Sequence, residues 1–118
     1  MSYLGATADL LKVARTVLRE TVMPQTSPEA RYEAAMVANA MAIAVRELEL
    51  GPKTRSAERA LLAGLYAAAD ASLPELRARF CRDLRAGRFG AEREGEIRAL
   101  LLETVRARLA ISNPTYGS

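Results

Sequence analysis

Apolar residues recur three and four positions apart along nearly the whole chain, and no segment alternates between apolar and polar residues with a period of two. Spacings of three and four place side chains on one face of an α-helix, whereas a strand requires the period of two. The chain has 118 residues, which suffices for one hydrophobic core but not for two. The sequence therefore predicts an all-α fold with a single domain over residues 1–118.

Prolines, glycines and capping residues divide this pattern into about five helices around a long central helix. The first is expected to begin near Thr7 and to stop before Pro24. The central helix is expected to begin at Ser27, with Pro28 in its first turn, and to end at Gly51-Pro52. The remaining three are expected over about 56–69, over about 73–86 with Ser72 as N-cap and Gly87 as C-terminal stop, and over about 91–110.

The expected central helix is apolar on every side, which predicts that other helices surround it in a bundle. One polar line interrupts it, because Tyr32, Asn39 and Arg46 are seven residues apart and fall within about 20° of one another. A buried Arg46 needs a partner, and Glu49 is a local choice. Two interpretations stay open: a satisfied polar network that fixes helix packing, or a pocket for a carboxylate or phosphate.

The composition excludes several classes of enzyme. The chain has no histidine and one cysteine, Cys81, so it cannot hold a Ser/His/Asp triad, a Cys/His pair or a zinc site with imidazole ligands. Cys81 lies on an apolar face and is expected to be a small core residue. Glu92, Glu94 and Glu96 alternate along a helix and cannot converge on one metal ion. We expect no catalytic residue, no cofactor and no metal.

Five arginines and one acidic residue, Asp83, lie between positions 77 and 88, in the expected fourth helix and the turn after it. Phosphate backbones attract such patches, but base recognition needs aromatic platforms or a groove-entering motif. Phe80 lies on the apolar face and is expected to pack inward. The basic side chains therefore form a solvated face, and we do not expect nucleic acid as a partner; they are Arg77, Arg79, Arg82, Arg85 and Arg88.

Localisation follows from two further observations. The residues from Met1 to Leu11 have neither the basic start nor the apolar run of a signal peptide, and a single cysteine gives no support for secretion. The longest stretch without charge, Ala34 to Val45, is about half of the ~20 residues that span a bilayer. The sequence predicts a cytoplasmic protein without a membrane segment.

Three stretches together resemble a known family: Ala38 to Pro52, Asp83 to Phe89, and Arg108 to Tyr116. The Arg-Glu-Leu-x-Leu-Gly-Pro segment that ends at Pro52 is the most specific part. The pattern is similar to a bacterial domain of unknown function whose members lie beside, or are fused to, aminoglycoside-phosphotransferase-like kinases, often near acyl-CoA dehydrogenases. One departure is Arg108, where lysine is common in the family.

The resemblance implies a context, and it carries no catalytic residues over. It marks Asn39, Arg46, Glu47 and the tail from Asn113 to Tyr116. Together with Tyr32 from the polar line, these give six candidate binding residues: Tyr32, Asn39, Arg46, Glu47, Asn113 and Tyr116. We expect a non-enzymatic accessory or interaction domain for a phosphotransferase-like kinase in acyl-CoA metabolism. The alternative is a carboxylate- or phosphate-binding protein that uses Asn39 and Arg46. A self-associating bundle is a third expectation, which rests on the many alanines.

Overall fold

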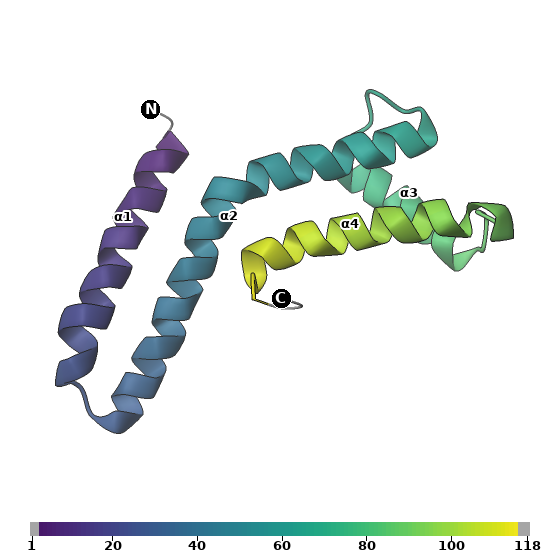
Figure 1. The fold of residues 1–118 in the computed structure, drawn as a ribbon. Helices are drawn as coiled ribbons and strands as arrows, with labels where there is room; N and C mark the ends of the chain where they lie inside the picture. Colours follow the sequence, from purple (N-terminus) through teal and green to yellow (C-terminus); the bar gives the residue numbers. More distant parts are fainter. Residues whose placement is uncertain (1–2, 116–118) are drawn as a thin grey trace. The chain divides into compact units, whose positions relative to one another are not determined.

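The computed structural model describes residues 3–115, and they form four α-helices and no strand (Figure 1). The helices are α1 (Tyr3–Val17), α2 (Pro28–Tyr66), α3 (Leu73–Arg85) and α4 (Glu94–Ser112). A π-helical turn, η1 (Leu18–Val22), and a 3-10 turn, η2 (Met23–Gln25), follow α1, and a second 3-10 turn, η3 (Ala91–Arg93), precedes α4. The all-α prediction is confirmed, whereas the prediction of about five helices is wrong.

The number of helices differs because α2 continues through Gly51-Pro52, where the sequence predicts a stop. Proline has no N–H, so the helical hydrogen bond to the carbonyl of Leu48 is lost, but its φ angle is that of a helix. A proline therefore weakens a helix at one bond without necessarily ending it. Two expected helices merge into one of 39 residues. The first helix also begins earlier than predicted, at Tyr3 and not near Thr7.

The chain divides into two compact units at Pro52. Unit 1 comprises Met1–Pro52 with Ile111–Ser118, of which residues 3–52 and 111–115 are described. Unit 2 comprises Lys53–Ala110. Because α2 and α4 each contribute residues to both units, the single domain over residues 1–118 stays a prediction.

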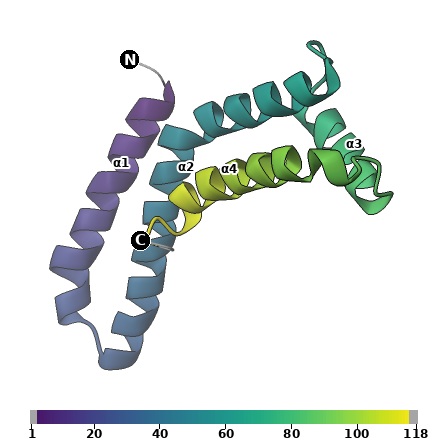
Figure 2. The same cartoon turned by 45° about the vertical axis from the view of Figure 1, so that its right-hand side comes forward.

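In unit 1, α1 lies antiparallel to the first part of α2 (Figures 1 and 2). The predicted cap is confirmed, since the Ser27 hydroxyl accepts a hydrogen bond from the N–H of Ala30 at 3.2 Å. Ala8 and Ala38 are buried, and such small side chains allow two helices to approach closely. In addition, the Nε of Arg15 donates to the carbonyl of Ala38 at 2.9 Å. Unit 1 is a helical hairpin with few large buried side chains.

Unit 2 has a core to which three helices contribute. Leu62 of α2, Leu76 and Phe80 of α3, and Ile97 of α4 are buried together, so the inward packing predicted for Phe80 is confirmed. The start of α3 is also as predicted, because the Ser72 hydroxyl accepts from the N–H of Glu75 at 3.3 Å. Such a cap satisfies one of the free donors of the first turn.

Two helices of unit 2 end in the same hydrogen-bonded motif. At the end of α3, the N–H of Arg88 donates to the carbonyl of Asp83, and Gly87 has a φ of 64°. At the end of α2, the N–H of Ala68 donates to the carbonyl of Ala63, and Ala67 has a φ of 51°. Both are Schellman motifs, in which glycine normally occupies the left-handed position. The sequence predicts the stop at Gly87, but an alanine gives no such signal at 67.

The loop between α2 and α3 is fastened by one side chain from α2. The Nε of Arg59 donates to the carbonyl of Ala71 at 3.0 Å, and a terminal nitrogen of the same guanidinium donates to the carbonyl of Ala69. These carbonyls lie outside any helix and would otherwise depend on water. The contacts hold the start of α3 against the end of α2.

Candidate interaction surface

The predicted polar line lies on the first part of α2, in unit 1. Tyr32 is 70% exposed and Asn39 is also exposed, whereas Arg46 and Glu47 are half-buried. The Nε of Arg46 donates to the carbonyl of Ile111 at 2.7 Å. The structure thus brings Arg46 to the end of α4, which is 65 residues away in the chain. That contact uses one of the three guanidinium nitrogens.

The predicted partner of Arg46 is wrong, because Glu49 pairs with Lys12 of α1 at 3.1 Å. In the tail, Asn113 is exposed, and its side-chain oxygen accepts from the hydroxyl of Thr115 at 3.1 Å. Tyr116 lies outside the described residues. Arg46 is therefore the predicted binding residue that the structure brings next to the segment before the tail, through the carbonyl of Ile111.

The enclosed position predicted for α2 is also wrong in unit 1. Tyr32, Met36 and Val37 of α2 are exposed. On α1, Leu10 is 70% exposed, and Val13 and Val17 are exposed as well. The two helices bury Ala8 and Ala38, so the small side chains face inward and the large apolar ones face solvent.

Within unit 2, four of the five arginines predicted to form a solvated face are exposed: Arg79, Arg82, Arg85 and Arg88. Two of them still have neighbours, since the guanidinium of Arg79 lies 4.0 Å from the centre of the Tyr66 ring and Arg88 lies 3.7 Å from the carboxylate of Asp83. Arg77 is half-buried and turns toward α2.

Arg77 belongs to a charged cluster around Glu58, which is buried on α2. Arg77 donates from Nε and from a terminal nitrogen to the two carboxylate oxygens, at 2.9 and 2.7 Å. Arg108 of α4 donates to the same carboxylate at 3.0 Å. The hydrogen bond from Arg77, together with the charge of Arg108, lowers the pKa of Glu58. One carboxylate therefore links three helices.

A second polar contact lies beside the core of unit 2. The hydroxyl of Tyr66 donates to Asp83 at 2.6 Å, and the Tyr66 and Phe89 rings are 6.4 Å apart. Burial of the phenol and the hydrogen bond to Asp83 raise the pKa of Tyr66 to about 12. The phenol therefore stays neutral well above the ordinary range of tyrosine.

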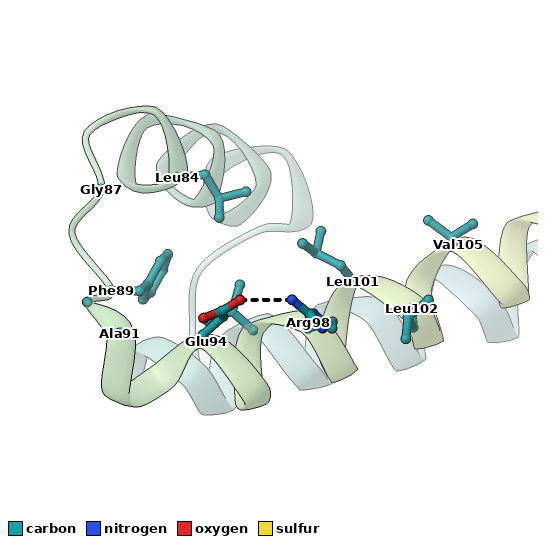
Figure 3. A pocket seen from close by; sticks show the side chains of 11 residues that line it. Leu84, Gly87, Phe89, Ala91, Glu94, Arg98, Leu101, Leu102 and Val105 are labelled. Atoms are coloured by element: carbon teal, nitrogen blue, oxygen red, sulfur yellow. Dashed lines mark hydrogen bonds and ion pairs between the residues drawn. The ribbon is translucent and has the colours of Figure 1, made fainter.

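An apolar groove of about 590 Å³ lies between the end of α3 and α4 in unit 2 (Figure 3). Leu84 of α3, Phe89 of the turn and Leu101 of α4 face it. Arg98 and Glu94 pair at 2.8 Å on its lining. A smaller cavity of about 190 Å³ shares Leu84, Leu101 and Val105 with the groove and extends to the Glu58 cluster. None of the five predicted binding residues within residues 3–115 lines the groove.

Neither the Glu58 cluster nor the groove of unit 2 is predicted from the sequence, although the sequence contains a signal for each. Glu58 lies three and four residues before Leu61 and Leu62, so a charge stands on the core face of its helix. Leu100, Leu101 and Leu102 are consecutive, so α4 is apolar on more than one side. Cys81 differs from its predicted core position: it is exposed, and it lines the smaller cavity.

Metal binding and membrane crossing can both be assessed over the part of the chain that the structure describes. Within residues 3–115, no group of three or more Cys, Asp or Glu side chains is placed to hold a metal ion. None of the described helices is long and apolar enough to cross a membrane. Ion pairs and apolar surfaces are the chemistry that this region offers.

The arrangement is that of a small all-α protein with apolar helix faces open to solvent. Residues 24–116 match the model of a family described as a domain of unknown function (DUF6285), and the chain belongs to this family. The match begins after α1 and covers α2, α3 and α4. No curated protein and no solved structure matches the chain.

Proposed function

We propose that the chain is a non-catalytic accessory domain that binds a partner protein, and that the partner is a phosphotransferase-like kinase of acyl-CoA metabolism. The choice of kinase comes from the family resemblance. The observation that carries the interaction role is the outward placement of large apolar side chains on both helices of unit 1, with Leu10 and Tyr32 each 70% exposed.

The outward side chains of α1 form one continuous surface. Leu10, Val13 and Val17 are three and four residues apart, which places them on one side of the helix. Fully burying a side chain of this size is worth about 1.5–3 kcal/mol. Contiguous apolar surfaces of this kind on a small protein mark interaction sites. A partner protein that covers this surface would gain the free energy of burying these side chains, which the hairpin itself leaves exposed.

The proposal of a non-catalytic role is supported by the composition. The chain has no histidine, and its one cysteine, Cys81, lies beside aliphatic side chains in the smaller cavity. Glu58 already accepts three hydrogen bonds from Arg77 and Arg108, which suits a structural ion pair better than a general base. We also propose a cytoplasmic location, which rests on the single cysteine.

The test is co-purification of the full chain with a phosphotransferase-like kinase of the same organism. We expect a complex at micromolar concentration, and we expect the double substitution Leu10→Gln and Val13→Gln to weaken it at least about tenfold, since two anchors are removed. Glu20→Gln, at an exposed position just after α1, is the matched control and should bind as the unchanged chain does. Separate elution of the two proteins would exclude the kinase as the partner, and equal binding by the double variant would exclude Leu10 and Val13 as its contact surface.

Light scattering separates this proposal from self-association. A monomer at the same concentrations leaves the apolar faces for a different protein. A stable homodimer that Leu10→Gln and Val13→Gln dissociate would assign these faces to a second copy of the chain instead.

Binding of a carboxylate or phosphate by Asn39 and Arg46 is the second candidate function. It is favoured by one observation: the hydrogen bond to Ile111 engages the Nε of Arg46 and leaves its terminal nitrogens available to a ligand. The two residues are seven positions apart, which is about 10 Å along a helix, so the Arg46 side chain must extend toward Asn39 for one anion to contact both. A phosphate-dependent rise in Tm that Arg46→Gln abolishes and Asn39→Ala preserves would support an anion site at Arg46 alone.

A further inference from the structure

The groove of unit 2 has the shape of a site for one helix. Its lining on α4 extends from Glu94 to Val105, about 17 Å or three helical turns. Ile97, Leu101 and Val105 form one row along α4, because they are four residues apart. Val105 in this row and Leu102 in the next row are 48% and 46% exposed, so apolar surface remains open to solvent along this part of α4. An amphipathic helix recognised by spaced apolar anchors needs a groove of this kind.

Arg98 lines this groove, and three further exposed arginines, Arg85, Arg88 and Arg106, each follow or precede a lining residue directly in the sequence. On α4, Arg98, Leu102 and Arg106 are four residues apart and form the row next to the apolar one. On the side of α3, Arg85 follows Leu84 directly and is exposed. Arg88, in the turn, is 3.7 Å from Asp83 and largely exposed. Glu94, which pairs with Arg98, is the acidic residue among those that line the groove.

We propose that this groove binds an acidic amphipathic helix of a partner protein. The leucines or other large aliphatic side chains of that helix insert along Leu101, Leu102 and Val105. Its glutamates or aspartates pair with Arg85, Arg106 and Arg98. This goes beyond the proposed function, because the surface lies in unit 2 and is separate from the apolar faces of unit 1.

The charge distribution is what selects an acidic partner. Arginine presents a fork of donors that matches a carboxylate, and exposed arginines next to the lining residues would repel a basic helix. A second copy of the chain is a poor occupant of the groove, because the chain has a formal net charge of +3. The apolar rows supply affinity, and the arginine rows supply selection between partners.

The probe is a fluorescein-labelled synthetic helix of about 15 residues, with leucines at intervals of three and four and glutamates on the flanking positions. A second peptide carries lysine in place of every glutamate. Binding to the full chain is measured by fluorescence anisotropy at low and high salt. We expect the glutamate peptide to bind at least about tenfold more tightly than the lysine peptide, and we expect salt to reduce the difference.

Two double variants locate the site. Leu102→Gln with Val105→Gln should weaken the glutamate peptide about tenfold or more, and circular dichroism checks that these exposed positions leave the fold intact. Arg85→Glu with Arg106→Glu should remove or reverse the preference for glutamate. Arg19→Glu with Lys53→Glu changes the net charge equally at exposed positions that do not line the groove and is the matched control. It should keep most of that preference.

Three results would overturn the proposal. The first is equal binding of the two peptides, and the second is an equal loss of preference in the control and in Arg85→Glu with Arg106→Glu. The third is saturable binding of a fatty acid such as dodecanoate, blocked by the Leu102 and Val105 substitutions, with no binding of either peptide. That third result would assign the groove to an anionic amphiphile. None of these results depends on whether a kinase binds unit 1.

Discussion

The two units bury different kinds of side chain. Unit 2 encloses Leu62, Leu76, Phe80 and Ile97 between three helices. Unit 1 buries Ala8, Ala38, Val45 and Ile111, while Leu10 and Tyr32 remain exposed. Large side chains between three helices provide their own core, whereas two helices that meet largely through small side chains approach closely but remove less apolar area from water. The comparison indicates that unit 2 contributes more to stability and that unit 1 leaves large apolar side chains exposed.

The comparison is tested most directly by truncating one core residue in each unit. Leu76, in unit 2, is 1% exposed, and Leu76→Ala should destabilise the protein by about 3–4 kcal/mol, through lost burial and a cavity. Val45, in unit 1, is also buried, and Val45→Ala should cost about 1–2 kcal/mol, because fewer atoms are removed. Urea denaturation followed by circular dichroism measures both. Equal losses would show that unit 1 has a core comparable to that of unit 2.

The charged cluster of unit 2 gives the next largest effect. Glu58→Gln should destabilise the protein by about 2 kcal/mol, less than the about 3–5 kcal/mol of a fully buried pair, because Arg77 and Arg108 are half-exposed. The hydrogen bonds and charges of the arginines lower the pKa of Glu58, so its stabilising effect is present above the ordinary pKa of a glutamate.

The same effect must therefore disappear as the pH falls through the lowered pKa of Glu58 in the folded protein. Urea titrations of the unchanged chain and of Glu58→Gln between pH 7 and about pH 2 measure this convergence. Glu96→Gln, which removes an exposed pair with Arg93, is the control and should leave stability unchanged. A constant difference between Glu58→Gln and the unchanged chain at every pH would contradict the assignment to the carboxylate.

Tyr66 should give a smaller effect with the opposite dependence on pH. Tyr66→Phe removes the hydrogen bond to Asp83 and should cost about 1 kcal/mol at neutral pH. Because the pKa of Tyr66 is raised to about 12, the neutral phenol contributes stability below the unfolded pKa of about 10, and this contribution is lost as the pH rises toward 12. The difference in phenolate absorbance between the unchanged chain and Tyr66→Phe should show the Tyr66 phenol ionising well above pH 10. If that difference appears near pH 10 in the folded protein, Tyr66 is not held as described.

The smallest effect concerns the helix end at Ala67, and it is stabilising. Ala67→Gly should raise stability by up to about 1 kcal/mol, because glycine adopts a φ of 51° without the cost of a Cβ. Gly87→Ala, at the equivalent position after α3, should lower stability by a similar amount. Thermal melts of the two variants give opposite shifts in Tm. Shifts of the same sign would mean that the two helix ends do not share the motif.

The contrast between these two helix ends shows which helix boundaries can be predicted from neighbouring residues alone. Ser27, Ser72 and Gly87 are correctly predicted as boundaries, because a hydroxyl cap or a left-handed glycine acts within a few residues of itself. Ala67 gives no local signal, since its conformation is imposed by the hydrogen bonds around it. Pro52 gives a misleading one, because the cost of one lost helical bond can be offset by packing elsewhere.

The sequence by itself determined that the chain is helical, that it has no histidine chemistry, and where three of the helix boundaries fall. Only the tertiary structure decided which apolar faces are covered: it exposed Leu10 and Tyr32 and opened the groove beside Leu101. It also brought Arg77 and Arg108 to Glu58 from two other helices. The physical reason is one of range. Periodicity and capping act over one or two turns, whereas burial and ion pairing depend on which distant helices meet.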